Sequence, residues 1–272
     1  MSYERRVERA HPALIVMVLD DSGSMASSME GTTDARYQWV ERYSGIILKE
    51  LLTRCTEVAG DNPIVKPRYY FDVIKYGSKV ETWPNGSNGN QPLDIGEIIK
   101  KFGDDNATFG LGGLLGGTDT ASAFNTAFTR LESALQSERF KDSFPPILFH
   151  LTDGESHTDA EPIAQQIMNL SSNDGSVLIV NAYIGTHTQL NYTGPADFPG
   201  YLNEQEVGSH PDNLRMFRMS SVIPKTIRDN LVNDGIFPSI RENARLFFDV
   251  RTKEMLKYVI QVVGSGGSRM LR

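Results

Sequence analysis

Continuous apolar stretches recur along the chain and predict buried strands. The first covers residues 13–19, and two more lie within PPILFHLTDG (145–154) and SVLIVNAYIG (176–185). Strands that are apolar throughout are typical of parallel sheets covered by helices on both faces. Further strands are expected in PRYYFDVIKYGS and KVETW, which meet at Gly77 and Ser78, and near residues 245–248.

In the segments between these stretches, apolar residues recur at helical spacing. From Asp34 to Cys55 they form one buried stripe, which is typical of an amphipathic helix. Other helices are expected at residues 94–102, 124–135, 159–170, 225–232 and 253–263, the last with Thr252 as its N-cap. Strands that alternate with helices predict an α/β protein, with a Rossmann-like, open and mostly parallel sheet between two layers of helices.

Two segments interrupt this alternation. A glycine-rich loop covers residues 103–120, and residues 186–213 are rich in Gly, Pro, Asn and Asp with little periodicity. We expect a single domain over residues 1–264, with a core at about 12–185 and 214–263, an insertion at about 186–213 and a flexible tail at 264–272. Four aromatic residues in or near the insertion either pin it to the domain or form a recognition surface: Tyr183, Tyr192, Phe198 and Tyr201.

Charge and cysteine content narrow the range of partners. The 272 residues carry a formal net charge of -7, and the pI is about 5.3. The chain therefore has no basic footprint for nucleic acid or for an anionic membrane surface. The single cysteine, Cys55, cannot form an internal disulfide and lies on the apolar stripe of its helix. The apolar run at 13–19 is too short to span a membrane, and we expect a cytoplasmic protein.

Oxygen-bearing side chains stand where the predicted strands end. Asp20, Ser22 and Ser24 leave the first strand, Thr118 ends the glycine-rich loop just before a helix, and Asp153 leaves the second buried strand. Ligands of open parallel sheets bind outside the carboxyl ends of the strands, so these three loops are expected to meet. Hard oxygen donors without thiolates or paired imidazoles select Mg²⁺, Mn²⁺ or Ca²⁺. The sequence therefore predicts a divalent-cation site.

The chain resembles von Willebrand factor A (VWA) domains in three short motifs, which match the metal-ion-dependent adhesion site of that family in order and separation. They are DDSGS, the first threonine of GGTDT (Thr118) and the aspartate of HLTDG (Asp153). The resemblance covers residues 12–185 and extends to the last strand and helix. It implies a sheet with one antiparallel edge strand and a single ion at its top, Mg²⁺ or alternatively Mn²⁺ or Ca²⁺. The implied ligands are Asp20, Ser22, Ser24, Thr118 and Asp153. The chain is also similar to bacterial stand-alone VWA proteins of the TerY-like group, which is associated with stress-response or phosphorylation operons.

Each of these residues also has an ordinary structural interpretation. Ser22 and Ser24 could cap a turn or short helix, and Thr118 could N-cap the helix that follows it. Asp153 could belong to a simple turn. The coincidence of five matching positions favours the metal site. Three further acidic residues either hydrogen-bond the ligands or face solvent: Asp21, Asp119 and Glu155. For Asp21, the alternation of side chains along the strand end favours solvent.

The resemblance implies a protein-binding module that receives an Asp or Glu of a partner protein at the ion, in a bacterial stress-response or signalling system. Two alternatives stay open: a metal-dependent phosphoester hydrolase that uses the same ion, and a structural subunit that has lost it. A phosphatase of the haloacid dehalogenase type needs a second aspartate where Ser22 stands, and no segment matches a nucleophile elbow or a phosphate-binding glycine loop. We therefore expect no enzymatic activity. His150 is expected to be a hydrogen-bonded imidazole of the core.

Overall fold

A computed structural model of the protein describes residues 3–29, 32–59, 62–84, 92–102, 109–184 and 189–265. Some sequence-based expectations fall outside these ranges. They are most of the predicted tail, the start of the glycine-rich loop, the turn-rich residues 85–91 and the first residues of the insertion.

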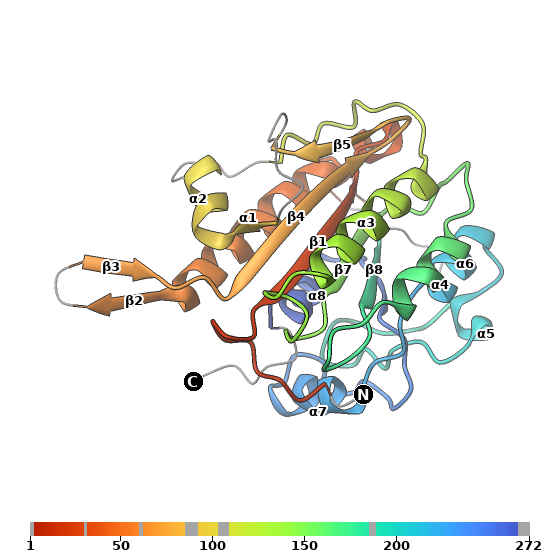
Figure 1. The fold of residues 1–272 in the computed structure, drawn as a ribbon. Coiled ribbons are helices and arrows are strands. Elements are labelled where there is room, and N and C mark those ends of the chain that lie inside the picture. Colours follow the sequence, from red (N-terminus) through yellow and green to blue (C-terminus); the bar gives the residue numbers. More distant parts are fainter. Residues whose placement is uncertain are drawn as a thin grey trace.

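A central sheet organises the molecule (Figure 1). Within the described residues it has seven strands: β1 (Ala13–Asp20), β4 (Tyr69–Tyr76), β5 (Val80–Trp83), β6 (Leu93–Asp94), β7 (Ile147–Thr152), β8 (Leu178–Tyr183) and β9 (Phe247–Asp249). The order is β5-β4-β1-β7-β8-β9, with β6 also paired to β4. β1, β4, β7, β8 and β9 are parallel, whereas β5 and β6 run antiparallel to β4. The expected α/β class, with an antiparallel strand at one edge, is confirmed.

Helices cover both faces of the sheet (Figure 1). On one face α1 (Arg36–Cys55) packs against α8 (Lys253–Ser265) and α2 (Ile95–Phe102). On the other, α3 (Thr120–Leu135) packs against α4 (Glu161–Asn169), and α6 (Pro211–Arg218) lies on β8. The short α5 (Glu204–Val207) packs on α6, and α7 (Lys225–Asn233) precedes β9. Among the described residues, no helix combines the length and apolar character needed to cross a bilayer.

Several elements differ from the sequence-based expectation. A hairpin of β2 (Thr56–Ala59) and β3 (Asn62–Val65) continues from the end of α1 and projects away from the main sheet (Figure 1). The insertion contains α5 and the start of α6, which begins with Pro211 at its first position. Such short elements lack the repeated apolar spacing that reveals longer helices. Phe198 and Tyr201 are fully buried against aromatic rings of the core, so the insertion is pinned to the domain.

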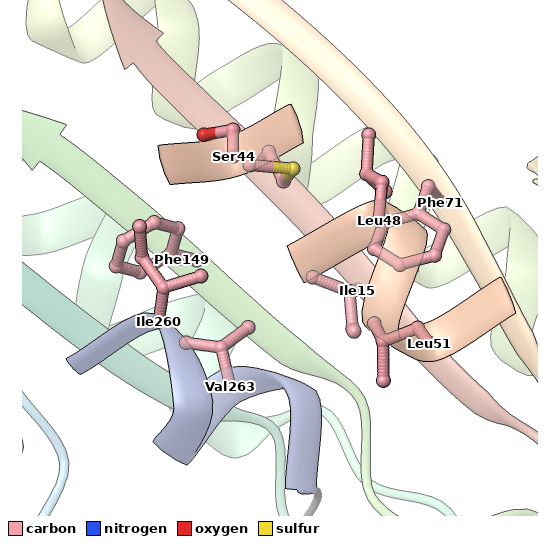
Figure 2. A pocket seen from close by; sticks show the side chains of 9 residues that line it. Ile15, Ser44, Leu48, Leu51, Phe71, Phe149, Ile260 and Val263 are labelled. Carbon is pink, nitrogen blue, oxygen red and sulfur yellow. The ribbon is translucent and has the colours of Figure 1, made fainter. Parts of the chain in front are cut away.

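The core between the sheet and the helices α1 and α8 is closely packed. Its one gap shown in Figure 2 is an apolar cavity of about 10 Å³, lined among others by Ile15, Leu48, Phe149 and Val263. A space of this size holds at most one water molecule, and apolar cavities stay dry. The cavity is therefore a packing defect.

Candidate metal centre

The strand register brings the ends of β1 and β7 together. β1 lies between β4 and β7, with Asp20 opposite Tyr76 on one side and Leu19 opposite Leu151 on the other. The chain leaves β1 towards one side of the sheet and later returns on its other side, which makes the edge between β1 and β7 a topological switch point. Asp153, directly after β7, therefore lies beside the end of β1.

Asp20 is fully buried, and hydrogen bonds fix both of its carboxylate oxygens. The backbone N–H of Ser22 donates to Oδ1 at 2.8 Å, and the hydroxyl of Thr152 donates to Oδ2 at 2.6 Å. The same hydroxyl accepts a hydrogen bond from the N–H of Gly154. Burial, together with the smaller effect of the Asp153 charge, raises the pKa of Asp20 to about 6 despite these hydrogen bonds.

Asp153 has one paired and one unpaired oxygen. Nη1 of Arg36 lies 2.6 Å from its Oδ2, and the Asp153 side chain is only 2% exposed. Its other oxygen, Oδ1, is buried and has no hydrogen-bond partner among the described residues. A buried, unpaired carboxylate oxygen is costly, so its presence beside a second buried carboxylate calls for a positive partner.

The hydroxyl of Ser22 lies beside the carboxylate of Asp20, and the hydroxyl of Ser24 lies beside that of Ser22. Ser22 directly precedes the 3₁₀ turn η1 (Gly23–Ala26), and Ser24 lies within it. Their Oγ atoms are 3.1 Å apart. Ser22 occupies the cap position of η1, yet its side chain makes no capping hydrogen bond. The capping interpretation is therefore wrong for Ser22, and its buried hydroxyl stays available to a ligand.

Thr118 lies in the loop between those of Asp20 and Asp153. Its carbonyl accepts the N–H of His157 at 3.1 Å, and the carbonyl of Gly116 accepts the N–H of Gly23 at 2.8 Å. The glycine-rich loop is thus bonded to both neighbouring loops. Thr118 is buried and is not the N-cap of α3, since that position belongs to Asp119. The predicted meeting of the three loops at one edge is observed.

The three additional acidic residues differ in their roles. Asp21 is buried rather than solvent-facing, because its Oδ1 accepts the N–H groups of Gly112 and Gly113. The expectation from strand alternation fails because the strand has ended and the glycine loop covers this side. Asp119 caps α3 through Ser122, whose hydroxyl is the main cause of the lowered pKa of Asp119. Glu155 is exposed.

The described part of the glycine-rich loop is held firmly. Besides the two bonds to Asp21, the carboxylate of Glu41 accepts the N–H groups of Phe109 and Leu111 at 2.7 and 2.6 Å. The carbonyl of Leu115 accepts the N–H of Ser78 at 2.6 Å. Two buried or half-buried carboxylates and neighbouring main chain thus fix the path of this loop. It therefore positions Thr118.

Replacing Gly77 with alanine should displace this loop. A Cβ atom at Gly77 would lie 2.5 Å from the carbonyl oxygen of Leu115, which is main chain and cannot rotate away. We expect the free energy of unfolding to fall by about 2 kcal/mol, and cation affinity to weaken with it. Urea unfolding measures the first effect. Gly194→Ala is the control, since a Cβ there meets nothing within 4 Å; equal effects of the two variants would contradict the prediction.

Beneath the site, His150 joins a buried chain of polar groups. Its Nε2 lies 2.7 Å from the hydroxyl of Tyr76, and its Nδ1 lies 2.7 Å from Oδ1 of Asn181. The amide of Asn181 donates to Ser220 and to the carbonyl of Met216, so its oxygen accepts from Nδ1. Burial lowers the pKa of His150 to about 4. The predicted core imidazole is confirmed.

The donor set suits a small, hard cation. Two buried carboxylates and the hydroxyls of two serines and a threonine are the oxygen ligands that Mg²⁺ and Mn²⁺ prefer. Oδ1 of Asp153 has no hydrogen-bond partner among the described residues and could act as a ligand. Across the described residues, no three His, Cys, Asp or Glu side chains gather in a way that could hold a metal.

Two contributors to the site were not identified in the sequence. Arg36 is the first residue of α1, where a positive charge interacts unfavourably with the helix dipole. An arginine at this position indicates that its side chain has an acidic partner elsewhere in the fold. Thr152 lies inside the predicted strand, where a threonine is unremarkable. Its hydrogen bond to Asp20 could not be anticipated, because it depends on the register of β1 against β7.

Comparison with known proteins finds similarity in structure only. No protein-family model matches the chain, and no curated protein matches its sequence. The PilB minor pilin from Streptococcus sanguinis superposes with a TM-score of 0.54 at 10% identity, over 95% of this chain and 62% of the pilin. A von Willebrand factor type A protein from Catenulispora acidiphila gives 0.48 at 15% identity, over 94% and 43%.

An aerotolerance-related membrane protein from Bacteroides fragilis gives a TM-score of 0.45 at 13% identity, over 92% of this chain and 98% of that protein. The chain spans less than two thirds of the pilin and of the Catenulispora protein. At such identities, the similarity to the pilin shows a shared fold alone.

Proposed function

We propose that this chain, which has the von Willebrand factor A fold, is a metal-dependent protein-binding module without enzymatic activity. Asp20, Ser22, Ser24, Thr118 and Asp153 would hold one Mg²⁺ or Mn²⁺ ion. When bound, the ion would supply an electrophilic position for a carboxylate of a partner protein. In the same proposal the module acts in the cytoplasm, in a stress-response or signalling system.

The pair of buried carboxylates carries this proposal. Asp20 and Asp153 lie side by side, and the raised pKa of Asp20 reflects burial first and the charge of Asp153 in addition. Each carboxylate is already oriented by a donor from its own surroundings, Thr152 for Asp20 and Arg36 for Asp153. Carboxylates that are held in place, one of them with an unpaired oxygen, suit a cation site, because the protein need not rearrange to bind the ion.

A hydrolase would need a general base near the ion. His150 does not serve, since both of its ring nitrogens are engaged by Tyr76 and Asn181 and its low pKa reflects complete burial. We therefore favour recognition over hydrolysis.

Titration of the chelator-treated protein with MgCl₂ by calorimetry tests the proposal. We expect one binding site, and Asp20→Ala or Thr118→Ala should weaken the affinity by about 100-fold. Thr126→Ala is the matched control, because its hydroxyl only bonds the preceding turn of α3. A partner captured from native lysate should be released by chelator and lost with Asp20→Ala. Capture that persists without metal would refute the proposal.

A further inference from the structure

Arg36 holds an unusual position beside the candidate metal centre. It is the first residue of α1, follows the N-cap Ala35, and its side chain is 27% exposed. No acidic side chain stands in the first turn of α1 to offset it. A cation at a helix N-terminus is unfavourable by a few tenths of a kcal/mol or more. Its contact with buried Asp153 supplies the compensation.

The contact restricts how Asp153 can bind a cation. The guanidinium hydrogen-bonds Oδ2 at 2.6 Å, and Oδ1 is the oxygen without a partner among the described residues. A cation bound through both oxygens of Asp153 would lie next to the guanidinium that holds Oδ2, so Arg36 favours coordination through Oδ1 alone. Asp20 has no such cation beside it: each of its oxygens accepts one neutral hydrogen bond and keeps a lone pair for a metal ion.

The number of oxygens that each carboxylate offers discriminates between cations. Ca²⁺ takes about six to eight ligands and often binds carboxylates through both oxygens, whereas Mg²⁺ takes about six near-octahedral ligands and binds carboxylates through one. We propose that Arg36 is the residue that determines cation selectivity: by holding Oδ2 of Asp153, it makes the site favour Mg²⁺ and Mn²⁺ over Ca²⁺. This inference rests on the proposed function, since it requires that the site bind a divalent cation.

The charge of Arg36 also affects cation binding, but this effect cancels in the ratio of the dissociation constants for Mg²⁺ and Ca²⁺. A positive charge beside the site repels any divalent cation, and Mg²⁺ and Ca²⁺ carry the same charge. Its removal alone would tighten the binding of both ions to a similar degree. A change in the ratio of their dissociation constants therefore reports the freed oxygen of Asp153.

Calorimetric titration with MgCl₂ and, separately, with CaCl₂ tests the inference on three variants of the full chain. In Arg36→Ala the preference for Mg²⁺ over Ca²⁺ should fall by about tenfold. Arg36→Lys, which keeps a charged donor for Oδ2, should retain the wild-type ratio within about twofold. Arg42→Ala is the matched control: it removes a charge from the same helix, and Arg42 pairs with Asp34.

An unchanged ratio in Arg36→Ala would overturn the inference, as would an equal change in Arg42→Ala. If Arg36→Ala does not fold, Arg36→Met takes its place, because it keeps the aliphatic stem and lacks the donor; the same tenfold change is expected. A wild-type protein that binds neither ion would instead refute the proposed function. Binding of both ions with an unaltered ratio would leave the proposed function intact and reject only the role of Arg36.

Discussion

Asp20→Asn is expected to stabilise the cation-free protein at pH 7 by about 3 kcal/mol and to abolish cation binding. A carboxyl group whose pKa is higher in the folded than in the unfolded state holds its proton more tightly when folded. The pKa of Asp20 is about 6, against an ordinary value of 3.8. Its charged form therefore costs about 3 kcal/mol of stability at pH 7. Asparagine has nearly the same shape without the charge, and about 3 kcal/mol is the upper limit of the gain, because its NH₂ group replaces one of the two accepting oxygens.

The expected gain depends on pH in a defined direction. As the pH falls through 6 towards 3.8, Asp20 takes up its proton in the folded state first, so the cost of its charge disappears. The difference in the free energy of unfolding between Asp20→Asn and the wild type should thus be largest at pH 7 and small near pH 4. Saturating MgCl₂ should stabilise the wild type and leave the variant unchanged.

Urea unfolding in chelator, at several pH values, measures this difference. Asp159→Asn is the control, since Asp159 is exposed and bonds only the start of α4. If Asp20→Asn were neutral or destabilising at pH 7, the charge of Asp20 would be stabilised by contacts within the folded chain. The site would then have no need of a cation.

His150 is expected to produce an opposite dependence of similar size. Burial lowers its pKa to about 4 from an ordinary value of 6.5. The unfolded chain therefore binds a proton at this residue between pH 6.5 and pH 4 while the folded chain does not. Stability falls as the pH drops through this window, by about 3 kcal/mol at its end.

In the wild type the two contributions largely cancel, so the test of His150 uses the Asp20→Asn background. There the free energy of unfolding should decrease steeply from pH 6.5 to pH 4.5. His157→Gln in the same background is the control, since His157 is exposed and its loss should not alter the slope. Nitrogen chemical shifts should also show His150 neutral at pH 5, with its proton on Nδ1 bonded to Asn181. A flat profile, or a charged ring at pH 5, would contradict the prediction.

These two residues show how burial of a polar group links the core to the site. Tyr76, His150 and Asn181 satisfy one another and carry no net charge, so they stabilise the interior of the sheet. Asp20, directly opposite Tyr76 in the paired strands, is equally buried but remains ionised at neutral pH. A bound cation would offset the unfavourable free energy of this buried charge, so cation binding and stability are coupled.

The order and type of the main elements were determined by the sequence alone. The stripe ending at Cys55 has the helical period, and the run at 13–19 is short, apolar throughout and β-branched in part, which favours a buried strand. The sequence also indicated the candidate ligands. Most of them directly follow strands, and the carboxyl ends of parallel strands share one edge of the sheet. Local pattern and general topology suffice for such inferences.

Only the tertiary structure decided the contacts between distant parts of the chain. Arg36 and Asp153 are 117 residues apart, and Thr152 and Asp20 are 132 apart. Asp21 faces the glycine loop because that loop folds over the end of β1, which no local period encodes. Hydrogen bonds of this kind depend on strand register and loop path, which the whole core fixes at once. They also orient the carboxylate of Asp20 and place the guanidinium of Arg36 on one oxygen of Asp153.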